Sequence, residues 1–416
     1  MSIQNGRDIR GGAHLARKEA SPAPEKKRGK HRGKKIALFA LLLAGLYCLA
    51  VFSQIPFIKK WRDIYIETAM GTMTHQWLAT AFIPGFVIDG VMDTRTDIED
   101  EQKNIETNWT IQLPPAEHIE KKDWSDLKAK FFSLYPEIDQ TSFNTYFDAH
   151  TDEWLPGDGY LVIDQADPDA KSTGIFSVYG DEVLAIDTLN GITIMKVTGD
   201  DYVGRLAIIK DPSQVGLGLS WNFGESGTVI SQIAGANNAV LAINASGFYD
   251  PDGQGNGGTP HGLVIKDGQQ LWDWVDEAGD KVIGFDYNNQ LNIRNFSSSS
   301  SFRDAVQFGP VLVLNGQAAL SGSSGWGMQP RSAIGQTEDG QVLMLVVDGR
   351  QPGYSVGCTV GDLAEVMLRY GAQQACNLDG GSSSIMYYNG RKISLPSGGD
   401  KINGRLLPNA FIVRPR

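Results

Sequence analysis

Cysteine is scarce in this sequence. The 416 residues include only Cys48, Cys358 and Cys376, and no C-x-x-C pair occurs. Three such positions exclude a disulfide-built scaffold, and the missing C-x-x-C spacing argues against thioredoxin-type redox chemistry and a cysteine-based structural zinc site. A bridge between Cys358 and Cys376 stays open, because the sequence gives no distance between their Cα atoms.

Positive charge is also in short supply. The chain has 37 Lys and Arg against 48 Asp and Glu, so its formal net charge is −11, which argues against a nucleic-acid-binding protein. The glycines show no G-X-Y period, which excludes a collagen-like chain. With 41% hydrophobic residues the chain is expected to fold, and its length exceeds the roughly 100–200 residues of one domain.

Charged residues are absent from one long stretch, Ile36 to Ile58. At about 1.5 Å per residue, a helix of this length crosses a hydrocarbon core of about 30 Å. The stretch predicts a single transmembrane helix over residues 36–58. The alternative is a cleaved signal peptide, whose apolar region is usually only about 7–15 residues long.

The charges on the two sides of this stretch predict its orientation. Residues 1–35 contain eleven Lys and Arg and three Asp and Glu, a net charge of +8, which leaves −19 for residues 59–416. By the positive-inside rule, we expect residues 1–35 to be a basic cytoplasmic tail. The sequence therefore predicts a single-pass protein of the cell membrane whose large carboxyl-terminal part is extracytoplasmic.

Two regions separate the apolar stretch from the rest of the chain. Residues 59–93 are apolar with scattered charges, and we expect an amphipathic juxtamembrane segment with Trp61, Tyr65 and Trp77 at the level of the lipid headgroups. Residues 94–171 are acidic and contain little glycine, which predicts a linker or accessory region. Apolar residues at helical spacing from Trp124 to Leu134 indicate one short helix within it.

Glycine is concentrated in the last part of the chain, where residues 171–416 hold 37 of the 48 glycines. Short β-branched apolar runs alternate there with turn signals, which are typical of strands joined by tight turns. Three Asx-Gly pairs each lie between two such runs and predict β-hairpins: Asp267-Gly268, Asp339-Gly340 and Asn389-Gly390.

Two helices are expected among these strands, at residues 228–236 and directly after Thr359, which is a favourable N-cap. Each leads into a strand that ends in a polar, glycine-rich turn. We therefore predict an α+β domain over residues 172–416, with mixed, mostly antiparallel sheets, a few helices and loops gathered at the strand ends.

Polar side chains follow four of the predicted strands. They are Asn244 in LAINASGFYD, Arg331 in QPRSAIGQT, Asp348 and Arg350 in LVVDGRQPG, and Asp379 to Ser383 in NLDGGSSSIM. The glycines of these turns allow a ligand to approach the backbone closely. Two carboxylates, two guanidinium groups and an amide suit an anionic, hydroxyl-rich ligand, because arginine binds phosphate through paired hydrogen bonds.

The run from RSAIGQ through VVDGRQPG to NLDGGSSS resembles the phosphodiester glycosidase family, whose animal member, the uncovering enzyme, removes N-acetylglucosamine from a phosphodiester. NASGFYD, GLVIKDGQ and GPVLVLNGQ extend the resemblance over about residues 179–413. Ser382 departs from the pattern, since the family more often has a third glycine there, and so do Ala245, Ser246 and Tyr249. The resemblance implies a hydrolase that cleaves the glycosidic C–O bond of a sugar-1-phosphodiester without an obligatory organic cofactor.

The chemistry of that reaction indicates roles for the turn residues. A phosphate monoester leaves as a weaker base than an alkoxide, so charge neutralisation by arginine replaces much of the work of a general acid. We expect Asp348 and Asp379 to be the catalytic carboxylates, without assigning acid, base or nucleophile to either. The expected substrate contacts are Arg331 and Arg350 to phosphate, Asn244 to sugar hydroxyls, the Gly380, Gly381, Ser382 and Ser383 amides to an oxyanion, and His261 to the sugar.

Other interpretations of the same residues stay open. The loop Asp250 to Gly258 is compatible with calcium, although it lacks the distal glutamate of an EF-hand. A non-catalytic module that holds an anionic glycan has similar needs, and a glycosyl transferase is the third candidate. For the leading interpretation, we expect a phosphate-containing glycan as the substrate, in cell-envelope or exopolysaccharide metabolism.

Overall fold

The computed structural model describes residues 30–111, 130–150, 160–274, 281–296, 301–400 and 402–416. The chain divides into two compact units, residues 1–53 and 54–416. In the first unit, helix α1 spans Lys30–Phe52, and its Gly33–Phe52 part is long and apolar enough to cross a membrane. The helix expected over residues 36–58 is thus wrong at its carboxyl end. Helix α1 ends at Phe52, and the next helix begins at Pro56. Proline is favourable at this first position because its missing N–H removes no helical hydrogen bond.

The second unit begins with three helices, α2 (Pro56–Met70), α3 (Trp77–Thr80) and α4 (Gly85–Gln102). Helix α2 buries Ile64, Ile66 and Glu67 on one face, while Trp61 and Tyr65 stay exposed on another. The expected amphipathic character is therefore present in α2. That its exposed aromatic side chains lie at a membrane surface stays a prediction.

Described residues of the region predicted as a linker or accessory region, residues 94–171, bond to the sheets. The side-chain amide of Gln102 exchanges two hydrogen bonds with the backbone of Val311, at 3.0 and 2.9 Å. Thr107 likewise donates its backbone N–H to the carbonyl of Ile293 at 2.9 Å. Further along, α6 (Gln140–Ala149) and strand β1 (Val162–Asp164) also belong to this unit. Most of the helix predicted around Trp124 lies outside the described residues.

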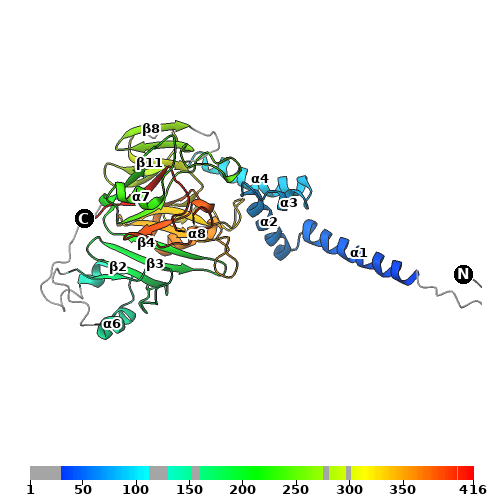
Figure 1. The fold of residues 1–416 in the computed structure, drawn as a ribbon, viewed down its shortest axis with the longest axis horizontal. Coiled ribbons are helices and arrows are strands. Elements are labelled where there is room, and N and C mark those ends of the chain that lie inside the picture. The colour runs from blue at the N-terminus through cyan, green and yellow to red at the C-terminus, as the bar shows by residue number, and fades with distance from the viewer. Residues whose placement is uncertain (1–29, 112–129, 151–159, 275–280, 297–300, 401) are drawn as a thin grey trace, which may run out of the picture. The chain divides into compact units, whose positions relative to one another are not determined.

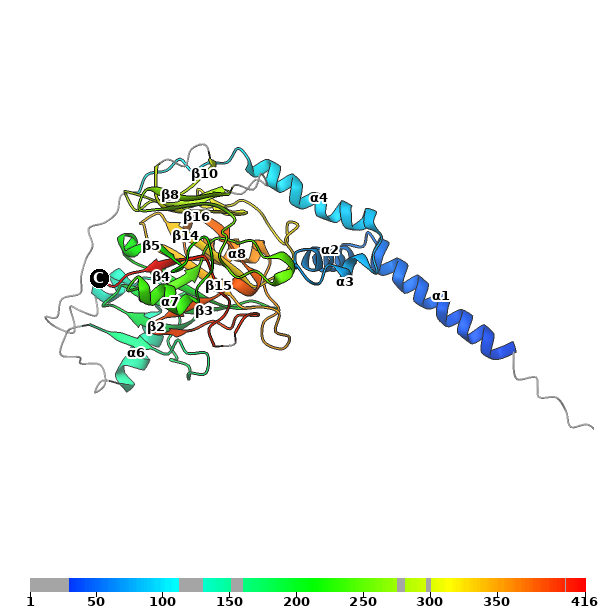
Figure 2. The same cartoon turned by 45° about the horizontal axis from the view of Figure 1, so that its top comes forward.

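Three sheets form the body of the second unit (Figures 1 and 2). The first has nine strands in the order β1-β2-β3-β4-β15-β14-β16-β12-β13, the second has the order β10-β9-β11-β7-β8, and the third has the order β18-β17-β6-β19-β5. Every pairing between these named strands is antiparallel, as predicted.

The remaining bounds are as follows. The strands are β2 (Glu182–Asp187), β3 (Ile192–Thr198), β4 (Val203–Ile209), β5 (Val215–Leu219), β6 (Leu241–Asn244), β7 (Gly262–Lys266), β8 (Gln269–Trp274), β9 (Lys281–Asp286), β10 (Leu291–Arg294), β11 (Phe302–Phe308), β12 (Val311–Leu314), β13 (Gln317–Ala318), β14 (Arg331–Thr337), β15 (Val342–Val347), β16 (Ala372–Leu378), β17 (Met386–Tyr388), β18 (Arg391–Lys392) and β19 (Asn409–Val413), and the helices are α7 (Ile230–Ala236) and α8 (Val360–Arg369).

The large sheet is buried on both faces. Along β4, Leu206 and Ile208 belong to a core that includes residues of α8, whereas Ala207 and Ile209 belong to the core shared with the other two sheets. Because successive side chains of a strand point to opposite faces, both sets are buried and the strand is apolar throughout. This explains why the sequence shows continuous apolar runs here rather than alternation.

The predicted turns and caps are found in the structure. Asp267-Gly268 joins β7 to β8 and Asn389-Gly390 joins β17 to β18, each with both residues at positive φ, as a type I′ turn requires. Asp339-Gly340 lies in the β14–β15 turn. The hydroxyl of Thr359 accepts the N–H of Asp362 at 3.1 Å, and the Asp362 carboxylate accepts the Thr359 N–H at 2.8 Å, which completes a capping box on α8.

Candidate functional site

The predicted polar turns meet at one end of the large sheet. Strand β14 lies between β15 and β16 and is antiparallel to both, so its first residues pair with the last residues of its neighbours. Arg331 pairs with Val347, and Ser332 pairs with Leu378. Asp348 and Arg350 lie in the turn after β15, and Asp379 lies in the turn after β16. The register therefore brings the two turns to the same end of the large sheet.

The Asp379 carboxylate lies at this end of the large sheet and is partly accessible to solvent. Its Oδ1 accepts the N–H of Gly380 at 2.9 Å, and its backbone N–H donates to the carbonyl of Ala245 at 3.1 Å. Burial raises the pKa of the Asp379 carboxyl to about 6, and this outweighs the lowering by the Ser383 hydroxyl and by the charge of Arg405. The group therefore changes protonation state close to neutral pH, as an acid or base catalyst does.

Asn244 is hydrogen-bonded to the turn that contains Asp379. Its side chain is completely buried, its Nδ2 donates to the carbonyl of Asp379 at 2.6 Å, and its Oδ1 accepts from the Ser332 hydroxyl at 2.6 Å and the Ile385 N–H at 3.2 Å. These bonds occupy both ends of the amide. The expectation that Asn244 contacts sugar hydroxyls therefore conflicts with the structure, in which it orients the turn.

The amides of the glycine-serine turn are mostly occupied within the protein. Gly380 donates to the Asp379 side chain, Gly381 donates to the carbonyl of Pro330 at 2.8 Å, and Ser383 donates to the carbonyl of Gly380 at 3.1 Å. These bonds occupy three of the four N–H groups that the predicted oxyanion cradle needs, and the Ser383 bond closes a 3₁₀ turn over Gly381–Ser383. The predicted cradle of four backbone amides is thus wrong for Gly380, Gly381 and Ser383.

Arg350 is the cation best placed for an anionic ligand. It is exposed and adopts φ = +58°, a conformation that a non-glycine residue rarely takes. Its Nε and Nη2 both donate to Oε1 of Gln329, at 3.2 and 2.7 Å, and a β-carbon on Gly381 would lie 3.1 Å from Nη2. Among the described residues Arg350 forms no ion pair, so its charge is available to a ligand.

Arg331, the other predicted phosphate ligand, has a different environment. It is buried, and its Nη2 donates to the carbonyls of Trp326 at 2.7 Å and Gly327 at 3.0 Å, while its Nε reaches the carbonyl of Cys358 at 3.4 Å. Burial lowers the pKa of its guanidinium to about 10. Arg331 therefore holds two loops together, and the structure does not support a direct phosphate contact by these donors.

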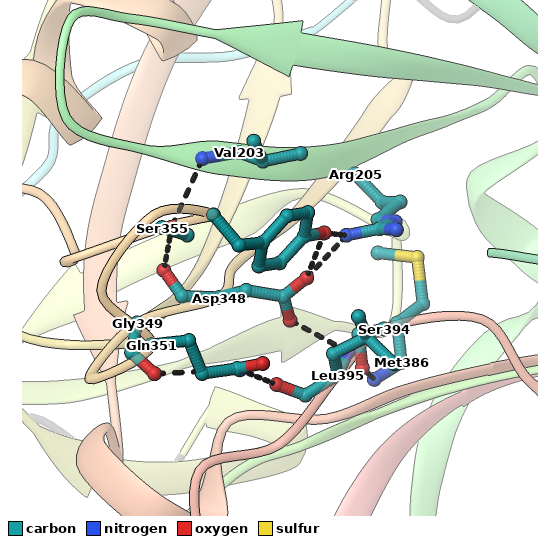
Figure 3. A network of polar contacts seen from close by, with 10 residues as sticks. Val203, Arg205, Asp348, Gly349, Gln351, Ser355, Met386, Ser394 and Leu395 are labelled. Carbon is teal, nitrogen blue, oxygen red and sulfur yellow. Dashed lines mark hydrogen bonds and ion pairs between the residues drawn. The ribbon is translucent and has the colours of Figure 1, made fainter.

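Asp348 lies inside a polar network rather than at the surface (Figure 3). Its side chain is fully buried and forms an ion pair with Arg205. Oδ2 also accepts the Tyr354 hydroxyl at 2.9 Å, and Oδ1 accepts the Leu395 N–H at 2.7 Å. With both oxygens bound inside the protein, the expectation that Asp348 acts on substrate beside Asp379 conflicts with the structure. Asp348 instead fixes the start of the turn that carries Arg350.

A second ion pair beside the site was missed in the sequence. Arg405 binds both oxygens of Asp250, at 2.7 and 2.8 Å, and donates to the hydroxyl of Ser382 at 3.2 Å. Burial and then the charge of Arg405 lower the pKa of the Arg350 guanidinium, and the same charge offsets part of the rise that burial causes in the pKa of Asp379. The three side chains therefore act on one another electrostatically. Ser382, where the family more often has glycine, thus contributes a side-chain contact to Arg405.

The same pair bears on the calcium interpretation of residues 250–258. Burial opposes ionisation of Asp250, but the Arg405 hydrogen bonds prevail and lower the pKa of its carboxyl. Both Asp250 oxygens are occupied by a guanidinium. Within the described part of the chain, no group of three His, Cys, Asp or Glu side chains has the arrangement of a metal site.

His261 belongs to a small aromatic group, defined here as Tyr249, His261 and Trp274. The ring centres of Tyr249 and His261 lie 5.8 and 5.1 Å from that of Trp274. Tyr249 and Trp274 are 52% and 45% exposed, so their ring surfaces are accessible. The backbone of Phe248 pairs with that of Pro260, which brings the segments of Tyr249 and His261 together. Asp250 directly follows Tyr249, so the ion pair of Asp250 with Arg405 lies next to this group.

Cys358 and Cys376, whose bridge the sequence left open, have separate surroundings. The Cys376 thiol lies 3.2 Å from the carbonyl of Pro310, whereas the backbone of Cys358 pairs with Gln329. Both side chains are buried and no disulfide joins them in the described structure. Burial raises the pKa of the Cys358 thiol, so it stays protonated and unreactive at neutral pH.

The chain is similar to several known proteins. The SPbeta prophage-derived uncharacterized protein YomE of Bacillus subtilis is 33% identical over 186 residues, which cover 41% of this chain and 28% of that protein. The chain thus spans less than a third of the length of this relative. A zebrafish N-acetylglucosamine-1-phosphodiester alpha-N-acetylglucosaminidase catalytic domain, auto-inhibited by its pro-peptide, shares 18% identity with a TM-score of 0.43, over 54% of this chain and 82% of that domain.

A hypothetical protein from Synechocystis shares 16% identity with a TM-score of 0.40, over 58% of this chain and 65% of that protein. The family model for phosphodiester glycosidase matches residues 237–414, a shorter range than the resemblance expected from residue 179. The matched range includes every predicted site residue. Residues 237–414 are therefore similar to the phosphodiester glycosidase domain.

Proposed function

We propose that this chain hydrolyses the glycosidic C–O bond of a sugar-1-phosphodiester, releasing a free sugar and a phosphate monoester. Similarity to the phosphodiester glycosidase domain supports a glycosidase-type hydrolase. The observation that carries the finer proposal is that two suitable groups are neighbours. Burial raises the pKa of the Asp379 carboxyl to about 6, and the charge of Asp379 acts on Arg350, which forms no ion pair among the described residues. A carboxylate for the anomeric carbon and a cation for the leaving phosphate are the two groups that this reaction needs.

The bond changes assign these groups. The anomeric C–O bond breaks, its electron pair goes to the departing phosphate oxygen, and Arg350 neutralises the charge that accumulates there. A water molecule supplies the new hydroxyl of the sugar and gives up one proton. Asp379 acts in its ionised form whether it receives that proton directly or first forms a glycosyl-enzyme intermediate.

Asp348 has a positioning role in this proposal. Its network fixes Ser355, whose hydroxyl donates to the Asp348 carbonyl at 2.6 Å and accepts the Val203 N–H at 3.0 Å. Between these anchors the turn closes on itself, with the Arg350 N–H bound to the carbonyl of Val356 at 2.9 Å. The unusual φ of Arg350 is therefore stabilised by the residues on both sides.

The exposed aromatic group supplies a surface for the sugar. Sugar rings present apolar C–H faces that pack on exposed aromatic rings, and His261 adds a polar nitrogen at the edge.

We expect Trp274→Ala to raise KM by about tenfold, equivalent to about 1.4 kcal/mol of binding, with little change in stability because Trp274 is half exposed. Steady-state kinetics check this, with Trp221→Ala as the control, since Trp221 is 65% exposed and lies outside this aromatic group. An unchanged KM in Trp274→Ala removes the aromatic group from the sugar site.

The setting of the reaction is also part of the proposal. The apolar helix Gly33–Phe52 anchors the chain in the cell membrane, with the basic amino-terminal tail cytoplasmic and the catalytic unit outside. The substrate is then a phosphate-containing glycan of the cell envelope or of an exopolysaccharide.

Release of reducing sugar from a synthetic sugar-1-phosphodiester tests the activity. The purified full chain is incubated with the compound, and free sugar and phosphate monoester are measured together. Equimolar appearance of both is the expected result. Tight binding of the compound with neither product formed contradicts the proposal and favours a glycan-binding module.

A further inference from the structure

We propose that Gln329 is a positioning residue for Arg350 and that the carboxyl end of helix α2 holds Gln329 in place. This makes the amino-terminal helices part of the anion site, although they lie outside the family-matched residues 237–414. The inference deepens the proposed function, on which it rests in taking phosphate as the ligand of Arg350.

The side-chain amide of Gln329 bridges the arginine and the helix. Its Oε1 accepts two hydrogen bonds from the Arg350 guanidinium, and its Nε2 donates to the carbonyl of Thr68 at 2.9 Å. Its backbone is pinned to Cys358 by two hydrogen bonds of 3.1 and 3.0 Å. Gln329 therefore has its backbone and both ends of its amide fixed, and its orientation fixes that of Arg350.

The Thr68 carbonyl is suited to this task by its place in α2. The last four carbonyls of a helix have no partner within the helix, and α2 ends at Met70. Gly71 takes the carbonyl of Glu67 at 2.8 Å, which leaves that of Thr68 for Gln329. The same end of α2 also binds Gly327 and Met328, the two residues before Gln329.

Two further contacts bind this loop to α2. The Thr68 hydroxyl accepts the N–H of Met328 at 2.9 Å, and the buried Glu67 carboxylate accepts the N–H of Gly327 at 3.2 Å. Gly327 has φ = +58°, and a β-carbon there would lie only 2.4 Å from the Thr68 nitrogen, so only glycine allows this approach. The Glu67 side chain is buried, and this burial raises the pKa of its carboxyl.

Two further arginines, Arg331 and Arg95, contact this loop. Arg331 donates to the carbonyls of Trp326 and Gly327, and Arg95 of α4 lies over the Trp326 ring, 5.1 Å from its centre. The α2–α3 turn also reaches the loop of Asp250, since a β-carbon on Gly253 would lie 3.6 Å from Thr74 Cγ2. The helices thus contact loops on both flanks of the Arg350–Asp379 site.

Phosphate binding by full-chain variants tests this inference. Gln329→Met keeps the side-chain length but removes all three side-chain hydrogen bonds, two from Arg350 and one to Thr68. We expect it to weaken binding of inorganic phosphate by about tenfold, measured by calorimetry, and to raise KM for the phosphodiester in parallel, with the melting temperature nearly unchanged. Gln329→Glu keeps an acceptor but adds a negative charge beside Arg350, and we expect a larger loss. Gln317→Met, at the exposed edge strand β13, is the matched control and keeps wild-type phosphate affinity.

The outcomes separate this inference from the proposed function. Wild-type phosphate affinity in folded Gln329→Met overturns the positioning role even if the enzyme is active. A tenfold loss of phosphate affinity, together with no hydrolysis by the wild type, supports the positioning role while the proposed function fails. Failure of the wild type to bind phosphate overturns the inference.

Discussion

Asp379→Asn is expected to lower kcat by roughly 10²–10⁴-fold, the range over which removal of an acid–base group acts. Asparagine keeps the side-chain oxygen that accepts the Gly380 N–H, so the turn keeps its geometry. What it loses is the ability to take a proton or attack the anomeric carbon. Steady-state hydrolysis of a sugar-1-phosphodiester measures the effect, and Asp267→Asn in the exposed β7–β8 hairpin is the matched control.

The pKa of Asp379 adds two signatures to this prediction. Because the ionised form is the active one, kcat/KM of the wild type falls as the pH drops below about 6. The raised pKa also means that the folded state favours the protonated carboxyl. Its stabilising contribution is complete below the unfolded pKa of about 3.9 and is lost as the pH rises through about 6.

Asp379→Asn is therefore expected to melt above the wild type at pH 7.5, with the difference vanishing near pH 4. Thermal unfolding at the two pH values measures this. Wild-type turnover in the variant, or an activity profile with no change near pH 6, contradicts the role assigned to Asp379.

Breaking the Arg205–Asp348 pair from one side is expected to destabilise the fold by about 3–5 kcal/mol, because it leaves a buried charge without its partner. Asp348→Asn removes the negative charge and leaves Arg205 with a neutral amide. The double variant Arg205→Met, Asp348→Asn is expected to recover part of the loss. Denaturant unfolding measures all three proteins.

A more exposed pair serves as the control. Arg391 pairs with Asp164 and its side chain is 32% exposed, so Arg391→Met is expected to cost at most about 1 kcal/mol. Asp348→Asn with wild-type stability contradicts the structural role of the buried pair. Activity that survives in the folded fraction of Asp348→Asn agrees with a positioning role, and its complete loss there favours the original expectation of a catalytic carboxylate.

The fold was predictable wherever local chemistry determines it. The Asp267-Gly268 turn, the Asn389-Gly390 turn and the Thr359 cap depend on a few neighbouring residues, and all three are present. The packing of the carboxyl end of α4 was not predictable, since Gln102 and its partner Val311 are 209 residues apart. A polar, glycine-poor segment has the same composition whether it is a linker or covers a sheet edge.

The sequence indicated which turns carry the polar residues of the candidate site, but not which of these side chains are accessible and which are bound inside the protein. Strand-end polarity indicated Asp379, Asp348 and Arg350 together, because all follow apolar strands. Whether such a carboxylate is accessible depends on distant partners, and Arg205, which binds Asp348, is 143 residues away in sequence. Arg405 and Gln329 were missed for the same reason: the role of each depends on a partner far away in sequence, although Gln329 begins the quoted run QPRSAIGQT.

The position of isotope from ¹⁸O-labelled water tests the central claim most directly. If the enzyme cleaves the glycosidic C–O bond, the label enters the anomeric hydroxyl of the released sugar and the phosphate monoester stays unlabelled. Mass spectrometry of the two products after partial conversion distinguishes them. Label in the phosphate instead shows cleavage of the P–O bond and contradicts the assignment of Asp379 to the anomeric carbon and of Arg350 to the leaving phosphate.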